Sequence, residues 1–381
     1  GIDDNASGRV NHYAIGSVLE LRFGPHYRAR IVKSPSTHFG LDGFDKANNV
    51  RGILPNGLTQ TIRDPKVDSL VEEEQTLKGS CPYLYAWDGE KYVFMTDCLW
   101  AAPLGLQVAR GVVAKDRPWE YLKLDGQNIK PRNGKYEFRI SEELWEVAYF
   151  DKVALSVVDH PADVEVWTNE KVGPANIATP TVFAFEKSDL RPIESALDGF
   201  GRDVTEKLRI ADREFVQGFD YRLRQGLCEP HWIDLDFGEL VPDEGGESDI
   251  GGESNEAAKV YLVLTGWILP TDTSLNIQID QNPDLGPIEF PSGWVPDASQ
   301  GDGWRKAIPV IGVPGGKTKT IVVDVTGIAR GDDPRLRVRT SAQIYWDSAQ
   351  IAVQSAAPQF RTHEVQLLRA EVAFHGFSKR L

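Results

Sequence analysis

The sequence predicts an all-β protein with a few short helices. Runs rich in Val, Ile, Tyr, Phe and Thr alternate with polar residues along most of the chain, as in half-buried strands. Tight-turn dipeptides separate several of these runs, at Asn56-Gly57, Asp88-Gly89 and Asn133-Gly134. They favour hairpins because Asn, Asp and Gly tolerate positive φ. Amphipathic helical patterns are scarce, and the clearest covers residues 203–215, where Asp203 can act as the N-cap.

Chain length and strand spacing predict three parts. A chain of 381 residues exceeds one ordinary hydrophobic core, so two or three domains are expected. We expect a small β module over residues 1–78, a middle β domain with a connecting segment and a short helix over 79–227, and a jelly-roll domain over 228–381. Regularly spaced strands with turns between them are typical of a sandwich or jelly roll. A galactose-binding-like form of the last domain is an analogy.

The strand-like runs follow one another in a regular order. The first part carries them at residues 18–23, 29–32, 50–54 and 58–62. The middle part opens with a hairpin at 81–97 and continues at 120–124, 135–140, 147–161 and 165–172. The Pro-spotted segment 173–192 and the helix after it are expected to form a connection. The last part carries strand-like runs at 231–237, 259–268, 274–280, 318–325, 336–340 and 342–347.

Charge and hydropathy narrow the possible partners. The net charge of −14 repels phosphate backbones, and no Lys/Arg-rich run is dense enough to compensate, so nucleic acid is not expected as a partner. No apolar run reaches the roughly 18 residues that span a bilayer, so no membrane span is expected in this chain. Because Gly1 is not an initiator Met, we expect a trimmed chain whose targeting signal would lie upstream.

The three cysteines are Cys81, Cys98 and Cys228, an odd number that leaves at least one unpaired within the chain. Cys81 and Cys98 flank the hairpin that turns at Asp88-Gly89. A two-residue turn would leave them out of register, whereas a longer or bulged turn could bring the sulfurs into range. The sequence is therefore compatible both with two buried thiols and with a disulfide between Cys81 and Cys98. There is no CxxC, so no zinc-ribbon or thioredoxin-like chemistry is indicated.

The segment Gly312–Thr318, GVPGGKT, resembles a phosphate-binding loop. Its spacing is one residue short, and Ile311 stands where the first Gly should be. A phosphate-binding loop also precedes a helix, but the following residues 318–325 have an alternating β pattern. We therefore expect a Gly-rich turn that enters a strand.

Other catalytic patterns are equally incomplete. Asp234 and Asp236 share one face of a strand whose other face is apolar, which favours a solvated strand face over a catalytic carboxylate pair. His363-Glu364 begins an HExxH, but Leu367 replaces the second His. We predict no catalytic residue, no metal site and no cofactor.

The acidic, Gly-rich segment between Pro242 and Ala257 carries no basic residue. It is expected to be a mobile loop between two strands, because it has too little apolar surface to offset its ordering entropy. Calcium binding is the alternative, since carboxylates and carbonyls are hard ligands, although the spacing matches no EF-hand loop.

Two tryptophans lie in the turn-rich segment FPSGWVPDASQGDGWRK, residues 290–306. An indole in a polar loop can stack on the apolar face of a sugar while neighbouring Asp or Arg side chains bind its hydroxyls. The predicted ligand-binding residues are Trp294, Trp304, Arg305, Asp297 and Asp302. The alternative is that both indoles fold over a sheet and cover the core. Trp232, Trp267 and Trp346 lie inside strand patterns and are expected in the core.

One stretch of the chain carries a family pattern. It runs from Ala14-Ile15-Gly16 through His38-Phe39-Gly40-Leu41 to the turn Pro55-Asn56-Gly57. Residues 10–75 thus resemble the ASPIC/UnbV module, although ASGRVNHY replaces most of its opening strand. The family has no assigned catalytic residues, and its members place the module after FG-GAP propeller or helical repeats in longer, often exported bacterial proteins. The resemblance therefore implies a fragment of a larger protein located outside the cell or in its envelope.

Together these patterns predict a non-enzymatic, exported binding or structural protein that recognises a glycan or another protein. The missing catalytic motifs, the Trp content and the resemblance support this expectation. The alternative is a polysaccharide-active enzyme with an attached sugar-binding jelly roll, which requires a cleft with two carboxylates of perturbed pKa. A structural spacer is the third possibility. The oligomeric state is not predicted.

Overall fold

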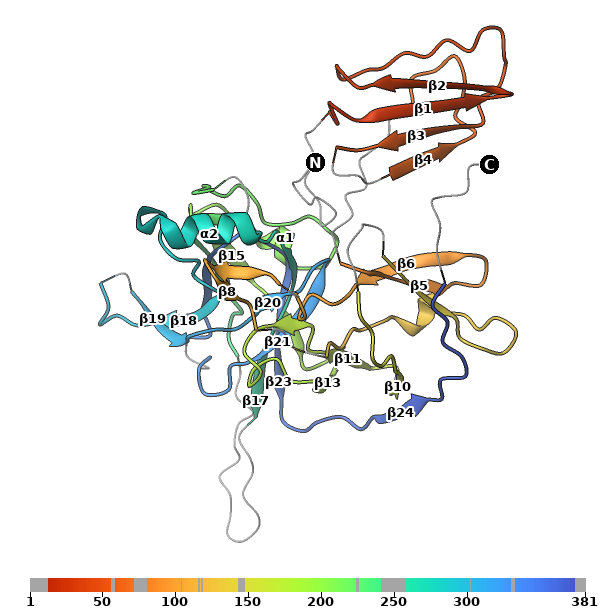
Figure 1. Cartoon of the computed structure of the whole chain (residues 1–381). Coiled ribbons are helices and arrows are strands. Elements are labelled where there is room, and N and C mark those ends of the chain that lie inside the picture. The colour runs from red at the N-terminus through yellow and green to blue at the C-terminus, as the bar shows by residue number, and fades with distance from the viewer. Residues whose placement is uncertain are drawn as a thin grey trace, which may run out of the picture.

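The computed structural model describes residues 13–55, 59–71, 81–103, 105–115, 117, 119–142, 148–223, 226–240, 258–301, 303–329 and 333–373. These residues form almost only β structure in antiparallel sheets, which confirms the predicted fold class. The acidic segment 242–257, the turn Asn56-Gly57 and Asp302 lie outside them. Figure 1 shows a small sheet near the N-terminus standing above a larger β body.

The N-terminal sheet has four strands in the order β2-β1-β3-β4. They are β1 Val18–Phe23, β2 His26–Ile31, β3 Asn49–Ile53 and β4 Thr59–Arg63. Its small core is built by Leu21, Phe23 and Ala47, against which Phe39 and Leu41 of the HFGL run pack. The sequence patterns therefore predicted these strands correctly, while the membership of the ASPIC/UnbV family stays a prediction.

Two facing sheets form a sandwich in the C-terminal half. One sheet has the order β14-β23-β17-β21 and the other β15-β16-β22-β18-β19. Their bounds are β14 Leu190–Pro192, β15 Ser195–Asp198, β16 Leu227–Asp236, β17 Lys259–Ile268, β18 Ser292–Pro296, β19 Trp304–Ile308, β21 Lys319–Asp324, β22 Leu336–Ala342 and β23 Ile344–Gln354. One apolar core joins both sheets, with Leu235 and Val338 from one and Leu264 and Ile351 from the other.

Strand alternation explains how the sandwich buries this core. In β16, Ile233 and Leu235 are buried, while Asp234 and Asp236 between and after them point to the other face. This confirms that the two aspartates share the strand face opposite to the core, where both are partly exposed. Trp267 and Trp346 are buried as predicted, but Trp232 lies on the outer face of its sheet and is partly exposed.

Strands that precede residue 228 also belong to the sandwich. β14 pairs with β23, and β15 pairs with β16, so each forms an edge of one of the two sheets. The end of the segment 173–192 thus contributes a sheet edge and is not only a connection. The sandwich therefore begins before residue 228, the domain boundary that strand spacing predicts.

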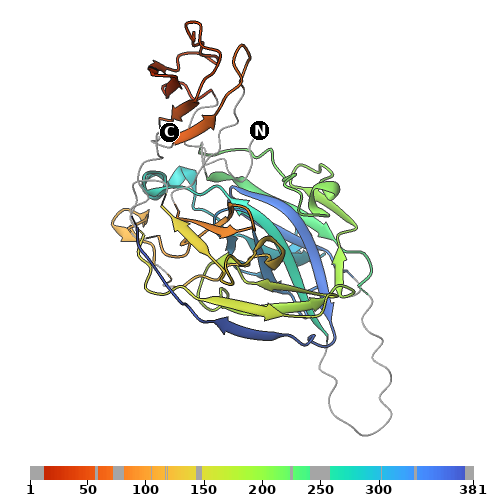
Figure 2. The ribbon, with the colours of Figure 1, turned by 90° about the vertical axis from the view of Figure 1, so that its right-hand side faces the viewer.

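The middle part consists of smaller antiparallel units. β5 Tyr83–Trp87, β6 Tyr92–Asp97 and β9 Phe138–Ser141 form one sheet, and β7 Gln107–Ala109 pairs with β8 Val112–Val113. The remaining pairs are β10 Leu155–Asp159 with β24 Arg361–Val365, β11 Val164–Thr168 with β13 Val182–Glu186, and β12 Lys171–Val172 with β20 Val313–Pro314. In Figure 2 the dark blue β24 runs along the lower margin, apart from the sandwich strands. The pairs β10–β24 and β12–β20 each join a strand of the middle part to a strand of the C-terminal part.

The helices differ from the sequence prediction. α1 covers only Thr205–Leu208, although a helical pattern extends over 203–215; Asp203 accepts a hydrogen bond from the Thr205 N–H. α2, Thr273–Gln281, replaces the strand predicted at 274–280, which is a correction. Short 3-10 turns lie at Gly126–Asn128 and Pro283–Leu285. Within the described ranges no helix has both the length and the apolarity needed to cross a membrane.

Two predicted turns are present. Asn133 and Gly134 have φ of 52° and 74° between the bridged residues Arg132 and Lys135, as in a two-residue turn. The Asp88-Gly89 turn joins β5 to β6 through a longer loop, because Trp87 pairs with Tyr92.

Cys81, Cys98 and Cys228 form no disulfide with one another in the structure. Cys98 is buried, and its Sγ donates to the Pro82 carbonyl oxygen at 3.5 Å. Burial raises the pKa of Cys98 and of Cys228 to about 12, so both stay protonated at neutral pH and are poor nucleophiles.

Candidate functional site

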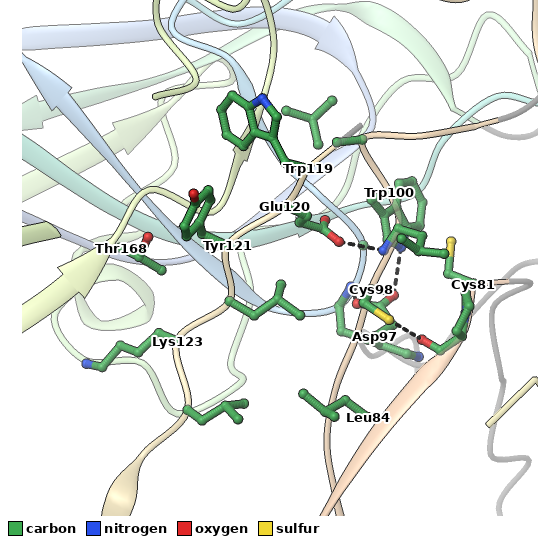
Figure 3. Close-up of a pocket in the computed structure, with 18 of the residues that line it drawn as sticks. Cys81, Leu84, Asp97, Cys98, Trp100, Trp119, Glu120, Tyr121, Lys123 and Thr168 are labelled. Atoms are coloured by element: carbon green, nitrogen blue, oxygen red, sulfur yellow. Dashed lines mark hydrogen bonds between the residues drawn. The ribbon is translucent and has the colours of Figure 1, made fainter. Parts of the chain in front are cut away.

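A large cleft lies where the middle part meets the sandwich. It encloses about 2270 Å³ and is lined by residues of the middle part together with sandwich residues such as Trp267, Val313 and Lys317. Figure 3 shows one part of it, with Trp119, Glu120 and Tyr121 along one segment and Asp97, Cys98 and Trp100 along another. Clefts of this kind, which combine apolar walls with convergent polar groups, are the usual location of ligand sites.

A buried ion pair joins the two parts beside this cleft, which Asp97 lines. Asp97 ends β6 and Lys319 begins β21, and the side chain of each is at most 2% exposed. The carboxylate of Asp97 accepts the Lys319 ammonium on Oδ1, the Lys317 N–H at 3.0 Å and the Trp100 Nε1–H on Oδ2 at 2.7 Å. Both oxygens of Asp97 therefore accept hydrogen bonds, as a buried carboxylate requires.

The GVPGGKT segment is the turn that makes this contact possible. Gly316 has a φ of +91°, and a Cβ there would lie 2.1 Å from Trp100 Nε1 and 2.5 Å from Asp97 Oδ2. Only glycine lets the backbone approach the indole this closely. β21 follows directly, which confirms a Gly-rich turn entering a strand and excludes a phosphate-binding loop.

Lys319 is surrounded by three acids: Asp97, Glu120 and Glu170. Burial opposes its charge, but these carboxylates together raise the pKa of Lys319. Burial raises the pKa of Glu120 and of Glu170, and Lys319 partly offsets this in both. The cluster therefore holds carboxyl groups that take up protons more readily than exposed ones.

The three acids differ in how many of their oxygens are engaged. Glu170 accepts the Lys123 N–H on Oε1 at 2.9 Å and the Thr320 N–H on Oε2 at 3.0 Å. Glu120 accepts the Leu99 N–H on Oε2 at 2.5 Å, and no described residue donates a hydrogen bond to its Oε1. Glu120 lines the cleft and Glu170 does not. Glu120 is thus the acid of the cluster that can offer an oxygen to a ligand.

Exposed aromatic side chains line the same cleft. They are Tyr121, Tyr136, Tyr149 and Phe150, with exposed fractions of 46%, 51%, 72% and 41%. The ring of Tyr121 meets Trp119 edge to face at 5.5 Å, and the Arg117 guanidinium lies 4.4 Å from the Trp119 ring centre. Arg117 in turn donates to the carbonyl oxygens of Lys171 and Ala178, both at 3.2 Å. These contacts fix Trp119 and Tyr121 in the wall of the cleft.

The residues predicted to bind a ligand lie elsewhere, at the β18–β19 hairpin. Trp294 is in β18 and Trp304 in β19, and both are partly exposed on the outer face of the five-stranded sheet. Arg305 and Asp297 form an ion pair with Nε and Oδ2 3.4 Å apart. None of these four residues lines the cleft. Ligand binding by them stays a prediction.

Sequence patterns did not single out the cleft residues. The sequence predicts a strand at 120–124, but in the structure this run belongs to no strand, which is a correction. The run Trp119–Leu124, WEYLKL, mixes aromatic, apolar and charged residues without strict alternation, so its pattern marks neither a face nor a site. Asp97, Glu120 and Lys319 come from distant segments, so only the fold brings them together.

Within the described ranges no three metal-ligating side chains are close enough to hold an ion. Comparison of the chain with protein-family models, with curated proteins and with solved structures found no match.

Proposed function

We propose that the chain is a non-enzymatic binding protein that takes a glycan in the cleft between the middle part and the sandwich. The observation that carries this proposal is that exposed aromatic rings and polar side chains line one and the same cleft. A pyranose presents C–H groups on one face, which pack against aromatic rings, and hydroxyls on its rim, which need donors and acceptors.

The polar groups of the cleft suit hydroxyl recognition. Oε1 of Glu120 offers an acceptor, and the ammonium of Lys123, which lies 5.2 Å from the Trp167 ring centre, offers donors. Tyr121, which lies between Glu120 and Lys123 in the chain, supplies an exposed aromatic ring. The net charge of −14 disfavours a nucleic acid as the occupant of the same rings.

The test is a glycan array followed by titration of the best ligand while the Trp fluorescence is recorded. Tyr121→Ala should weaken binding about tenfold or more, as expected for an aromatic contact at the centre of a site. Tyr27→Ala is the matched control, because Tyr27 is 49% exposed on the separate N-terminal sheet. Absence of any glycan ligand, or equal affinity of the two variants, would exclude a glycan site in the cleft.

A polysaccharide-active enzyme is the second candidate, and one observation favours it. Glu120 lines the cleft, and burial raises its pKa, as a general acid that protonates a glycosidic oxygen requires. In that case Glu120→Gln should keep glycan affinity and lose the release of reducing ends. If the unmodified protein releases no reducing ends from a bound polysaccharide, the enzyme is ruled out for that ligand.

Export is part of the proposal. It is supported by the resemblance of residues 10–75 to the ASPIC/UnbV module, whose bearers are often exported. Fractionation of cells that make the protein from its complete gene tests it, and recovery in the cytoplasm alone would contradict it.

A further inference from the structure

The outer face of the five-stranded sheet carries a second aromatic array. Trp232 of β16, Trp294 of β18 and Trp304 of β19 lie on this face, and Arg337 and Arg339 of β22 lie between them. The residues next to them in the strands, such as Ile233, Val295 and Val338, are buried in the core. The array is called the Trp–Arg face below.

Arg337 holds the centre of the Trp–Arg face. Its guanidinium lies 4.6 Å from the Trp232 ring centre and 4.2 Å from that of Trp304. It also donates two hydrogen bonds to Asp234, from Nε at 2.6 Å and from the second nitrogen at 2.9 Å. A bidentate, stacked guanidinium is held in one orientation. The two indoles beside it are therefore preorganised.

Trp294 is fixed in a similar way. Its Nε1–H donates to Ser292 Oγ at 3.0 Å, and the Ser292 hydroxyl donates to the Arg339 carbonyl oxygen at 3.2 Å. The Lys306 ammonium and the Arg339 guanidinium lie 5.2 Å and 5.4 Å from its ring centre. A ligand that stacks on these rings loses little side-chain entropy from the protein, because the rings are already ordered.

The charges of this face are largely paired. Arg337 pairs with Asp234, Arg339 lies 3.5 Å from Glu289, and Arg305 lies 3.4 Å from Asp297. An anionic ligand would have to compete with these carboxylates for the arginines. A neutral ligand with hydroxyl groups can use the remaining donors and acceptors without breaking a pair.

We infer that the Trp–Arg face is a second, separate binding surface, and that its ligand is a neutral polysaccharide whose extended chain stacks flat sugar rings on Trp294 and Trp304. This inference does not depend on the cleft, because none of the residues of the face lines it. If the cleft also binds the same polymer, the two sites would act together and raise the avidity of the whole chain.

The test is native gel electrophoresis of the whole protein in gels that contain hydroxyethyl cellulose, a mixed-linkage β-glucan or, as the anionic comparison, alginate. The affinity for a neutral polymer, measured from the retardation at several polymer concentrations, should fall about tenfold in Trp294→Ala and in Trp304→Ala. It should be unchanged in Tyr27→Ala. Trp304→Tyr, which keeps a ring beside Arg337, should retain most of the retardation. Thermal unfolding of each variant checks that the fold is intact.

The outcomes separate the two surfaces. Loss of retardation in Trp294→Ala and Trp304→Ala but not in Tyr121→Ala supports binding at the Trp–Arg face, whether or not the cleft binds a glycan. The inference would be overturned if alginate alone retarded the protein or if no polymer did. It would also be overturned if Trp294→Ala and Trp304→Ala were retarded as strongly as the unmodified protein. Loss in Tyr121→Ala alone would assign the binding to the cleft.

Discussion

Lys319 shows what a buried charge requires at the scale of one residue. Its ammonium is almost completely removed from water, so the ion pair with Asp97 and the nearby acids Glu120 and Glu170 must replace its hydration. Such a pair adds little net stability compared with apolar residues, but the loss of one partner leaves the other charge buried without compensation.

We therefore expect Asp97→Asn to lower the free energy of unfolding by about 3 kcal/mol or more, the usual cost of breaking a buried ion pair. Urea unfolding followed by Trp fluorescence measures this change. Arg335→Ala is the control, because it removes an exposed ion pair with Asp333 and should cost less than about 1 kcal/mol. Equal effects of the two substitutions would contradict the structural role of Asp97.

Lys171 gives a pH-dependent prediction. It is 3% exposed, and burial lowers its pKa to about 8 from an ordinary 10.5. Between these two values the unfolded chain binds more protons at this residue than the folded protein does, so the contribution of Lys171 to stability rises with pH in that window. Below about pH 8 the folded state bears the whole cost of the buried charge.

Lys171→Met should therefore stabilise the protein at pH 7, by up to about 3 kcal/mol, and should flatten the rise of stability from pH 8 to 10.5. Unfolding in urea at a series of pH values measures both effects. Lys207→Met is a control at a residue that is not buried. An unchanged pH profile in Lys171→Met would show that the ammonium is better hydrated than its burial indicates.

At the scale of elements, α2 shows how a tertiary contact decides local structure. Asp272 caps the helix by accepting the Leu275 N–H at 3.0 Å. Asn276 is buried and donates from Nδ2 to the Gln107 carbonyl oxygen of β7 at 2.8 Å. The helix thus ties the β7–β8 ribbon of the middle part to the sandwich.

Asn276→Ala should lower the free energy of unfolding by about 1–3 kcal/mol, because the Gln107 carbonyl loses a buried partner. Amide hydrogen exchange should show faster exchange in α2 and the β7–β8 ribbon. Gln278→Ala lies on the same helix outside the buried set and should change neither quantity by much. Slower exchange or no change in Asn276→Ala would contradict this role of the side chain.

The same helix marks the limit of what the sequence patterns could predict. Leu275, Ile277 and Ile279 alternate with polar residues as in a strand, and the helix follows from its cap and from Asn276, whose partner lies far away in sequence. Strands such as β16 were predictable because their alternation reports burial directly. The cleft was not, because Asp97, Glu120 and Lys319 meet only through the fold.

At the scale of the whole molecule, the middle part and the sandwich share structure. β10 pairs with β24 and β12 with β20, so strands from both parts complete the same sheets. Glu170 also accepts the Thr320 N–H, next to the Asp97–Lys319 pair. Elements that share sheets and buried charges are expected to unfold together.

The N-terminal sheet stands apart from this unit. Among the described residues its four strands pair with one another alone, and the members of its small core all come from the first part. A protein that begins at residue 79 should therefore keep the main thermal transition within about 2–4 °C, which corresponds to a change of less than about 1 kcal/mol. It should also keep the affinity for any glycan bound by the full chain.

A protein that begins at residue 228 is the matched comparison. It lacks β14 and β15, the edge strands that pair with β23 and β16, and it lacks Asp97, Glu120 and Glu170 around Lys319. We expect it to show no cooperative transition in calorimetry, because two sheet edges and a buried ammonium are left unpaired. A cooperative transition in this shorter protein would show that the sandwich folds without the middle part, and the cleft would then lie between two independent domains.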